Sequence, residues 1–123
     1  MNEIITLAET TRKQLNLKYN LESVKFLEGF IERVKSEMTE EELKGLINSC
    51  TAFLGECIVR NYGGNWLNTN GEMSVAFDNE NKVFALTKVE KQFKNGLEDS
   101  IYSFYISIPA IFNLKQKRKW WQV

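Results

Sequence analysis

The clearest helical pattern in the chain is residues 39–64, TEEELKGLINSCTAFLGECIVRNYGG. Thr39 and Glu42 have the spacing of a capping box, in which each side chain accepts a hydrogen bond from the other residue's backbone N–H. Gly63 and Gly64 can end the helix, because glycine adopts the left-handed conformation of a C-cap without strain. Between these signals the apolar residues occupy one arc of about 140° on a helical wheel. They are Leu43, Leu46, Ile47, Cys50, Phe53, Leu54, Cys57 and Ile58. The pattern predicts a central helix over about residues 39–61.

Small residues form a second stripe on the same predicted helix. Gly45, Ala52 and Val59 lie opposite the apolar arc, with Gly55 beside them. A glycine inside a helix costs about 1 kcal/mol relative to alanine, so close packing of another element is a sensible reason for two of them. We therefore expect this helix to be contacted on more than one side.

Two helices are predicted before the central one. Residues 3–16 carry a weak helical stripe with charged residues between the apolar ones. Asn20 suits the N-cap of a second helix, because its side-chain oxygen can accept an early backbone N–H. The apolar residues of that second helix have helical 3/4 spacing. They are Val24, Leu27, Ile31, Val34 and Met38.

A three-stranded antiparallel meander is predicted over about residues 65–88. Asn70-Gly71 is a strong hairpin signal, and a two-residue loop there pairs Thr69 with Glu72 and Trp66 with Val75. In this register Trp66, Met73, Val75 and Phe77 share one face, which should be the core face. A turn at residues 78–81 then leads to an expected third strand over 83–87, and residues 91–96 are expected to form a solvated turn.

The last element is predicted as a helix over about residues 97–113, although its β-branched and aromatic residues also favour a strand. The apolar residues follow helical spacing, and Glu98 and Asp99 would lie in the first turn, where the helix dipole favours acids. Pro109 is expected to bend or end this helix near Ile108. Tyr102 and Ile106 fall outside its main apolar arc. This indicates burial from two sides or a protein–protein surface, with a homodimer through this helix as one form.

The composition fits a single α+β domain over residues 1–123 and excludes several kinds of active site. Of the 123 residues 43% are apolar, and 16 Lys and Arg balance 16 Asp and Glu, which argues against a uniformly basic nucleic-acid binder. The absence of histidine excludes Ser-His and Cys-His nucleophile pairs and His-containing zinc sites. Cys50 and Cys57 would lie roughly 10 Å apart on one helix, beyond disulfide reach. They are expected to be buried free thiols, and no metal site or cofactor is predicted.

The sequence also predicts a cytoplasmic protein. The first 14 residues, MNEIITLAETTRKQ, have no long apolar run and no small-residue cleavage site of the kind found in signal peptides. No uncharged apolar stretch approaches the ~18 residues needed to span a bilayer. Reduced thiols fit the same compartment.

Two segments resemble an uncharacterised family of small bacterial α+β domains. Residues 55–66, GECIVRNYGGNW, resemble the family's G-E-x-I-x-R-x-x-G-G-x-W stretch, and residues 89–101, VEKQFKNGLEDSI, resemble its V-x-K-x-x-K-N-G-x-x-D-S-I segment. The resemblance covers about residues 40–112. Ala85 stands where the family typically has a proline in the last strand. The resemblance implies an α+β fold with a terminal helix, and it implies no reaction and no catalytic residue.

The candidate site residues within the predicted domain form two groups. Glu56 and Arg60 are an i,i+4 pair near Trp66, which predicts either a helix-surface ion pair or a site that faces a partner or ligand. Asp99 and Ser100 open the last helix, where capping and dipole compensation would explain both. A paired-carboxylate acid/base site would need Glu56 and Asp99 to converge. Nothing in their spacing shows this, and no residue is predicted to be catalytic.

A basic tail follows the domain. Residues 115–123, KQKRKWWQV, carry four basic residues and no acidic one. Trp120 and Trp121 could fold back onto the body, or they could anchor a protein partner together with Arg118. They could also bind an anionic lipid surface or RNA, although four basic residues make nucleic acid a weak candidate.

Taken together, these features predict a non-enzymatic cytoplasmic interaction domain that binds a specific protein, one version being an immunity-type protein that neutralises a toxin. The alternative is a small-ligand or hydrolytic domain built around Glu56, Arg60, Trp66 and Asp99. A second alternative is a peripheral binder of anionic lipid or RNA through residues 115–123.

Overall fold

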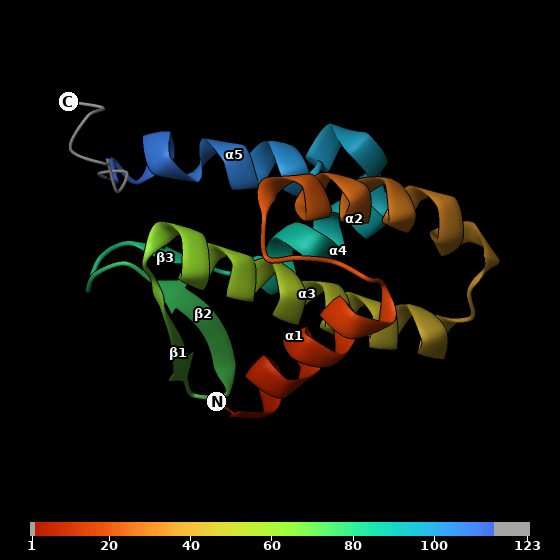
Figure 1. The fold of residues 1–123 in the computed structure, drawn as a ribbon, viewed down its shortest axis with the longest axis horizontal. Helices are drawn as coiled ribbons and strands as arrows, with labels where there is room; N and C mark the ends of the chain where they lie inside the picture. Colours follow the sequence, from red (N-terminus) through yellow and green to blue (C-terminus); the bar gives the residue numbers. More distant parts are fainter. Residues whose placement is uncertain (1, 115–123) are drawn as a thin grey trace.

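The computed structural model describes residues 2–114, which form five α-helices and one small sheet (Figure 1). The α-helices are α1 (Asn2–Gln14), α2 (Leu21–Val34), α3 (Glu40–Tyr62), α4 (Ala85–Asn95) and α5 (Ile101–Ile111), and two 3-10 turns are η1 (Lys35–Glu37) and η2 (Gly96–Asp99). The strands are β1 (Asn65–Thr69), β2 (Glu72–Ala76) and β3 (Lys82–Val83), in the order β1-β2-β3 and antiparallel throughout. The α+β class with N-terminal helices, a meander and a C-terminal helix is confirmed.

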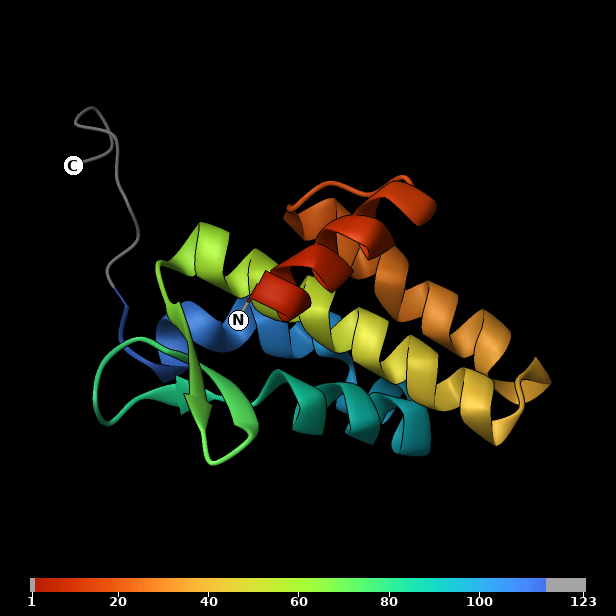
Figure 2. The same ribbon diagram turned by 90° about the horizontal axis from the view of Figure 1, so that it is seen from below.

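Helix α3 is the centre of the structure, as the sequence predicts. Thr39 Oγ1 accepts from the Glu42 backbone N–H at 3.2 Å, and Glu42 Oε1 accepts from the Thr39 N–H at 2.9 Å, which is the predicted capping box. Gly63 ends the helix with a φ of 84°. Every residue from Cys50 to Ile58 is buried. A helix buried around its whole circumference needs neighbours on all sides, and Figure 2 shows α3 running between α1 and α4.

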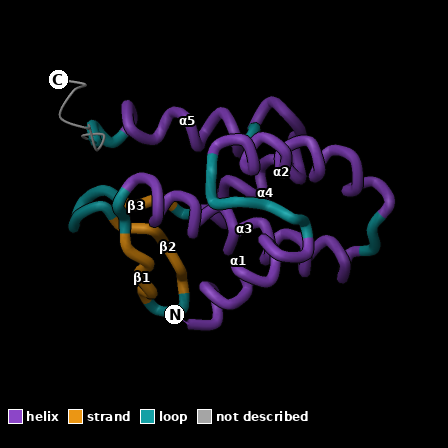
Figure 3. Tube along the Cα trace, in the orientation of Figure 1, coloured by secondary structure: helices purple, strands orange, loops and turns teal. Residues whose placement is uncertain are grey.

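The hairpin has the predicted register. Thr69 pairs with Glu72 and Trp66 with Val75. Asn70 and Gly71 have φ values of 54° and 86°, which are the two positive values that a type I′ turn requires. Trp66 and Val75 are buried, so this face of the hairpin packs against the helices, and Figure 3 shows the strands gathered at one end of the helical body.

The predicted third strand is wrong beyond Val83. The strand β3 ends there, and residues 85–95 form α4 instead of the end of a strand and a solvated turn. Ala85, Val89 and Gln92 are buried at helical spacing, so one face of this segment covers α3 while its lysines lie outside. Only the short extended segment before the helix matches the predicted strand.

The last helix is shorter than predicted at both ends. Gly96 has a φ of 76°, and Glu98 and Asp99 lie in the η2 turn before the helix. Ser100 is the N-cap, because its extended backbone starts α5 and its side chain accepts from the Ser103 N–H at 3.1 Å. Pro109 does not end the helix near Ile108, since α5 continues to Ile111.

Gln92 of α4 ties three helices together. Its fully buried side chain donates to the Glu28 carbonyl at 2.9 Å and to Glu32 Oε2 at 3.0 Å, both on α2. Its Oε1 accepts, at 2.9 Å, from the backbone N–H of Ile101, the first residue of α5. A buried amide is stable only when its donors and acceptor are bonded, so these bonds fix α2, α4 and α5 against one another.

Asn20 caps α2 as predicted, with Oδ1 accepting from the Ser23 N–H at 2.9 Å.

None of the helices within residues 2–114 combines the length and apolar character needed to cross a bilayer.

The two glycines of α3 should respond in opposite ways to alanine. A Cβ on Gly55 would lie 2.0 Å from Cη2 of Trp66, whereas a Cβ on Gly45 meets nothing within 4 Å. We expect Gly55→Ala to lower the free energy of unfolding by roughly 2 kcal/mol through overpacking. Gly45→Ala should raise it by up to about 1 kcal/mol through helix propensity. Urea denaturation measures both, and equal effects would contradict the close approach at Gly55.

Candidate functional site

Glu56, Arg60 and Trp66 come together at the contact between α3 and β1. Trp66 Nε1 donates to Glu56 Oε1 at 2.9 Å, and Arg60 Nε donates to Glu56 Oε2 at 2.8 Å. Glu56 is 5% exposed and Trp66 is 8% exposed. The sequence therefore placed these three residues together correctly. The carboxylate, however, points inward and not toward a surface site.

This cluster continues across the surface to α1. The Arg60 guanidinium lies 4.0 Å from the ring centre of Tyr19, and the Tyr19 hydroxyl donates to Glu9 Oε2 at 2.9 Å. Hydrogen bonds from Arg12 and Tyr19 lower the pKa of Glu9 to about 2. Burial, with the neighbouring Glu9 carboxylate, raises the pKa of Tyr19 to about 12. The loop between α1 and α2 is thus fastened to the end of α3.

The chemistry available to Glu56 is limited by this arrangement. Each carboxylate oxygen already accepts a hydrogen bond from a protein side chain, and the group is almost completely buried. A general base or nucleophile needs a free lone pair within reach of a substrate. Glu56 serves instead as the acceptor that allows an indole N–H to be buried beside the core.

Asp99 and Ser100 lie in a different place from the Glu56 cluster. The Ser100 hydroxyl donates to Glu28 on α2 and also caps α5, while Asp99 Oδ2 accepts from Asn95 Nδ2 at 2.7 Å. Both line a cavity of about 250 Å³ with Lys88 and Lys91, and none of Glu56, Arg60 and Trp66 lines it. The four-residue site of the ligand-binding alternative is therefore not assembled.

The two cysteines are free and buried, as predicted. Burial raises the pKa of the Cys50 thiol to about 12, and it raises the pKa of Cys57 as well. Since the thiolate is the nucleophile and the metal ligand, neither side chain is prepared for such chemistry. Across residues 2–114, no group of three or more acidic or cysteine side chains could hold a metal ion.

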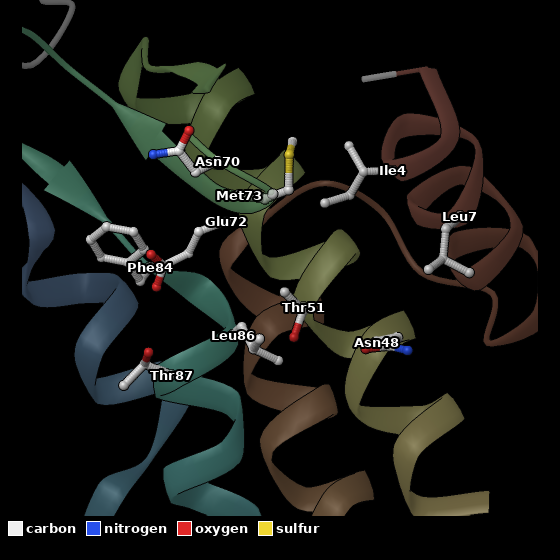
Figure 4. A pocket seen from close by; sticks show the side chains of 11 residues that line it. Ile4, Leu7, Asn48, Thr51, Asn70, Glu72, Met73, Phe84, Leu86 and Thr87 are labelled. Atoms are coloured by element: carbon white, nitrogen blue, oxygen red, sulfur yellow. The ribbon is translucent and has the colours of Figure 1, made fainter. Parts of the chain in front are cut away.

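One hollow of the structure was not predicted from the sequence. A groove of about 500 Å³ opens between α1, α3, the β1–β2 hairpin and the start of α4. In Figure 4 Ile4 and Leu7 form one wall and Phe84, Leu86 and Thr87 the other. Its residues are Ile4, Leu7, Asn48, Thr51, Asn70, Gly71, Glu72, Met73, Phe84, Leu86 and Thr87, which we call the groove residues. They come from four separate elements, so no local pattern could reveal the groove.

The tail residues named as candidates, Arg118, Trp120 and Trp121, lie outside the described residues. Their role therefore stays a prediction.

The structural role of Glu56 can be tested by comparing two substitutions. Glu56→Ala should lower the free energy of unfolding by roughly 2–3 kcal/mol, because it leaves the buried Trp66 N–H without an acceptor. Glu56→Gln keeps an amide oxygen for Trp66 and should cost only about 1 kcal/mol. Chemical denaturation followed by far-UV circular dichroism provides the measurement. Equal losses for the two variants would contradict this role.

Glu9 should make the stability of the protein depend on acid pH. Its pKa in the folded protein is lower than the ordinary value of 4.5, so its contribution is present above about pH 4.5 and is lost as the pH falls toward 2. The difference in Tm between the wild type and Glu9→Gln should thus be largest near neutral pH and should shrink below pH 4.5. Glu90→Gln on α4 controls for the removal of one negative charge, and the same pH dependence in that variant would contradict the assignment.

No protein-family model, curated protein or solved structure matches this chain. The resemblance of residues 55–66 and 89–101 to a family of small bacterial domains stays a prediction.

Proposed function

We propose that the protein is a non-enzymatic cytoplasmic interaction domain that binds a specific protein through α5 and the adjoining edge of α2. The observation that carries this proposal is the composition and exposure of α5. Its 11 residues, IYSFYISIPAI, include no charged side chain, yet Ile106 is 48% exposed and Ile111 is 59% exposed. A helix this apolar is normally covered on most sides, and here two of its isoleucines are open to solvent.

Exposed residues of α2 extend this surface. Lys25 Nζ lies 4.5 Å from the ring centre of Tyr102. Helices α2 and α5 lie side by side and run antiparallel (Figure 1). Leu21 is one turn before Lys25 on α2, and Ile106 is one turn after Tyr102 on α5. Leu21 is 41% exposed. We call Leu21, Lys25, Tyr102 and Ile106 the α2–α5 face. Exposed apolar residues that adjoin one another are typical of protein-binding surfaces.

The lysines beside this face favour acidic groups at matching positions of the partner. Lys25 flanks α5 on one side, and Lys88, whose Nζ lies 4.8 Å from the ring centre of Phe104, flanks it on the other. Glu98 and Asp99 line the same hollow as Lys88, so Lys25 is the lysine without acidic residues of that hollow beside it. An apolar surface with an acidic residue opposite Lys25 would complement the face.

The burial of Glu56 and its hydrogen bonds within the protein also support a binding role without catalysis. Its carboxylate is occupied by Arg60 and Trp66, so the hydrolytic alternative loses its principal residue. Neutralisation of a toxin by an immunity-type protein is one form of this function, because it requires stoichiometric binding and no reactive group.

The test compares three variants in capture from a lysate of the organism that makes the protein. Ile106→Lys places a charge in the α2–α5 face, and Ile5→Lys on α1 is its matched control, since Ile5 is also an exposed helical isoleucine. Trp120→Ala/Trp121→Ala removes the aromatic anchors of the tail. We expect one protein, retained stoichiometrically at high salt by the wild type and by Ile5→Lys, to be weakened about tenfold or more by Ile106→Lys.

The other outcomes would overturn the proposal in distinct ways. Retention that depends only on Trp120 and Trp121 and disappears at high salt would favour the lipid or RNA alternative. A purified wild type that forms a dimer, disrupted by Ile106→Lys in light scattering, would show that a second copy covers the face. Equal retention by Ile5→Lys and Ile106→Lys would exclude the face altogether.

A further inference from the structure

The groove offers a second site that is independent of the α2–α5 face. It lies on the opposite side of the molecule, near the N-terminus and the tip of the hairpin (Figure 1). Its volume of about 500 Å³ is within the range of small-molecule sites, which typically combine apolar walls with a few polar groups. Ile4, Leu7, Met73 and Leu86 supply aliphatic and thioether walls, and Phe84 supplies an aromatic one.

Thr51 on the floor of the groove has a hydroxyl without a partner. Among the described residues, Thr51 Oγ1 is a buried side-chain oxygen with no hydrogen bond, and the residue is only 9% exposed. A threonine inside a helix commonly bonds to the carbonyl four residues before it, as Thr11 does with the Leu7 carbonyl at 2.8 Å. In Figure 4 Thr51 lies between Leu86 on one side and Ile4 and Leu7 on the other. A buried hydroxyl that stays unpaired is unfavourable. The oxygen is itself closed off from solvent, so Thr51 adds no hydrogen-bonding position to the surface of the groove.

The charge of the groove restricts the ligand further. Glu72 is the charged side chain among the groove residues, and none of these residues is basic. Asn48 and Thr87 add neutral polar groups. In a concave site of low polarity, a carboxylate selects cationic ligands and disfavours anionic ones.

We propose that this groove is a binding site for a small hydrophobic amine, such as an arylalkylamine. The apolar body packs against the walls formed by Ile4, Leu7 and Leu86, with Phe84 beside the ring. The ammonium group pairs with Glu72 at the rim. The proposed role is binding without chemical conversion.

Three probes with the same indole ring separate the contributions of charge and apolar contact. Tryptamine is cationic at neutral pH, tryptophol replaces the amine with a neutral hydroxyl, and indole-3-acetate is anionic. Each is titrated into the full-length protein while NMR follows the methyl groups of Ile4, Met73 and Leu86. We expect all three methyls to shift with tryptamine, with affinity falling from tryptamine to tryptophol to indole-3-acetate. A spread of roughly tenfold or more corresponds to one charge interaction at a partly buried site.

One variant tests the residue that gives this specificity, and a second is its control. Glu72→Gln should remove the preference for tryptamine over tryptophol while leaving the binding of tryptophol unchanged. Thr51→Val has the same shape without the closed-off hydroxyl, so it should raise the Tm of the free protein by several degrees and leave tryptamine binding unchanged.

The proposal fails if none of the three probes shifts the groove methyls, or if the shifts map to another surface. Equal affinities for the cation, the alcohol and the acid would show that the groove is not selective for amines. The response of Glu72→Gln decides the question, because Glu72 is exposed on the hairpin and its substitution leaves the core intact. None of these outcomes depends on the α2–α5 face, so a failure here leaves the protein-binding proposal to its own test.

Discussion

The contact of Trp66 with Gly55 and Glu56 determines how the sheet meets the helices. A buried indole needs an acceptor for its N–H, and a buried carboxylate needs donors; the hydrogen bond of 2.9 Å between Trp66 and Glu56 satisfies both. The missing side chain of Gly55 allows the ring to approach the helix backbone. Because this contact holds the hairpin against the second half of α3, the hairpin tip lies beside α1 and the start of α4. The groove is a consequence of that placement.

The polar side chains of this protein fall into two classes with different consequences. Those of Glu56 and Gln92 are buried and fully bonded within the protein. They fix the packing of the elements and have nothing to offer a substrate. Glu72, in contrast, lines a hollow that the protein does not fill.

The sequence predicted the features that depend on neighbouring residues. The capping box of Thr39 and Glu42, the Asn70-Gly71 turn and the pairing of Trp66 with Val75 are local, and all are confirmed. Helix α4 was missed because burial of Gln92 depends on Glu28 and Glu32, about 60 residues earlier in the chain. The proximity of Glu56 to Trp66 was foreseen, but its inward orientation depends on the close approach at Gly55. The groove joins four elements, so it becomes visible only after they pack.

For the protein-binding function proposed above, the bond from the Ile101 N–H to Gln92 has a kinetic consequence. It anchors the first turn of α5 to two other helices before any partner arrives. The surface that carries Ile106 is therefore already ordered in the free protein, and association does not have to supply the conformational entropy of folding a helix. A preformed surface of this kind favours rapid rigid docking, in which the lifetime of the complex and not the rate of encounter distinguishes one partner from another.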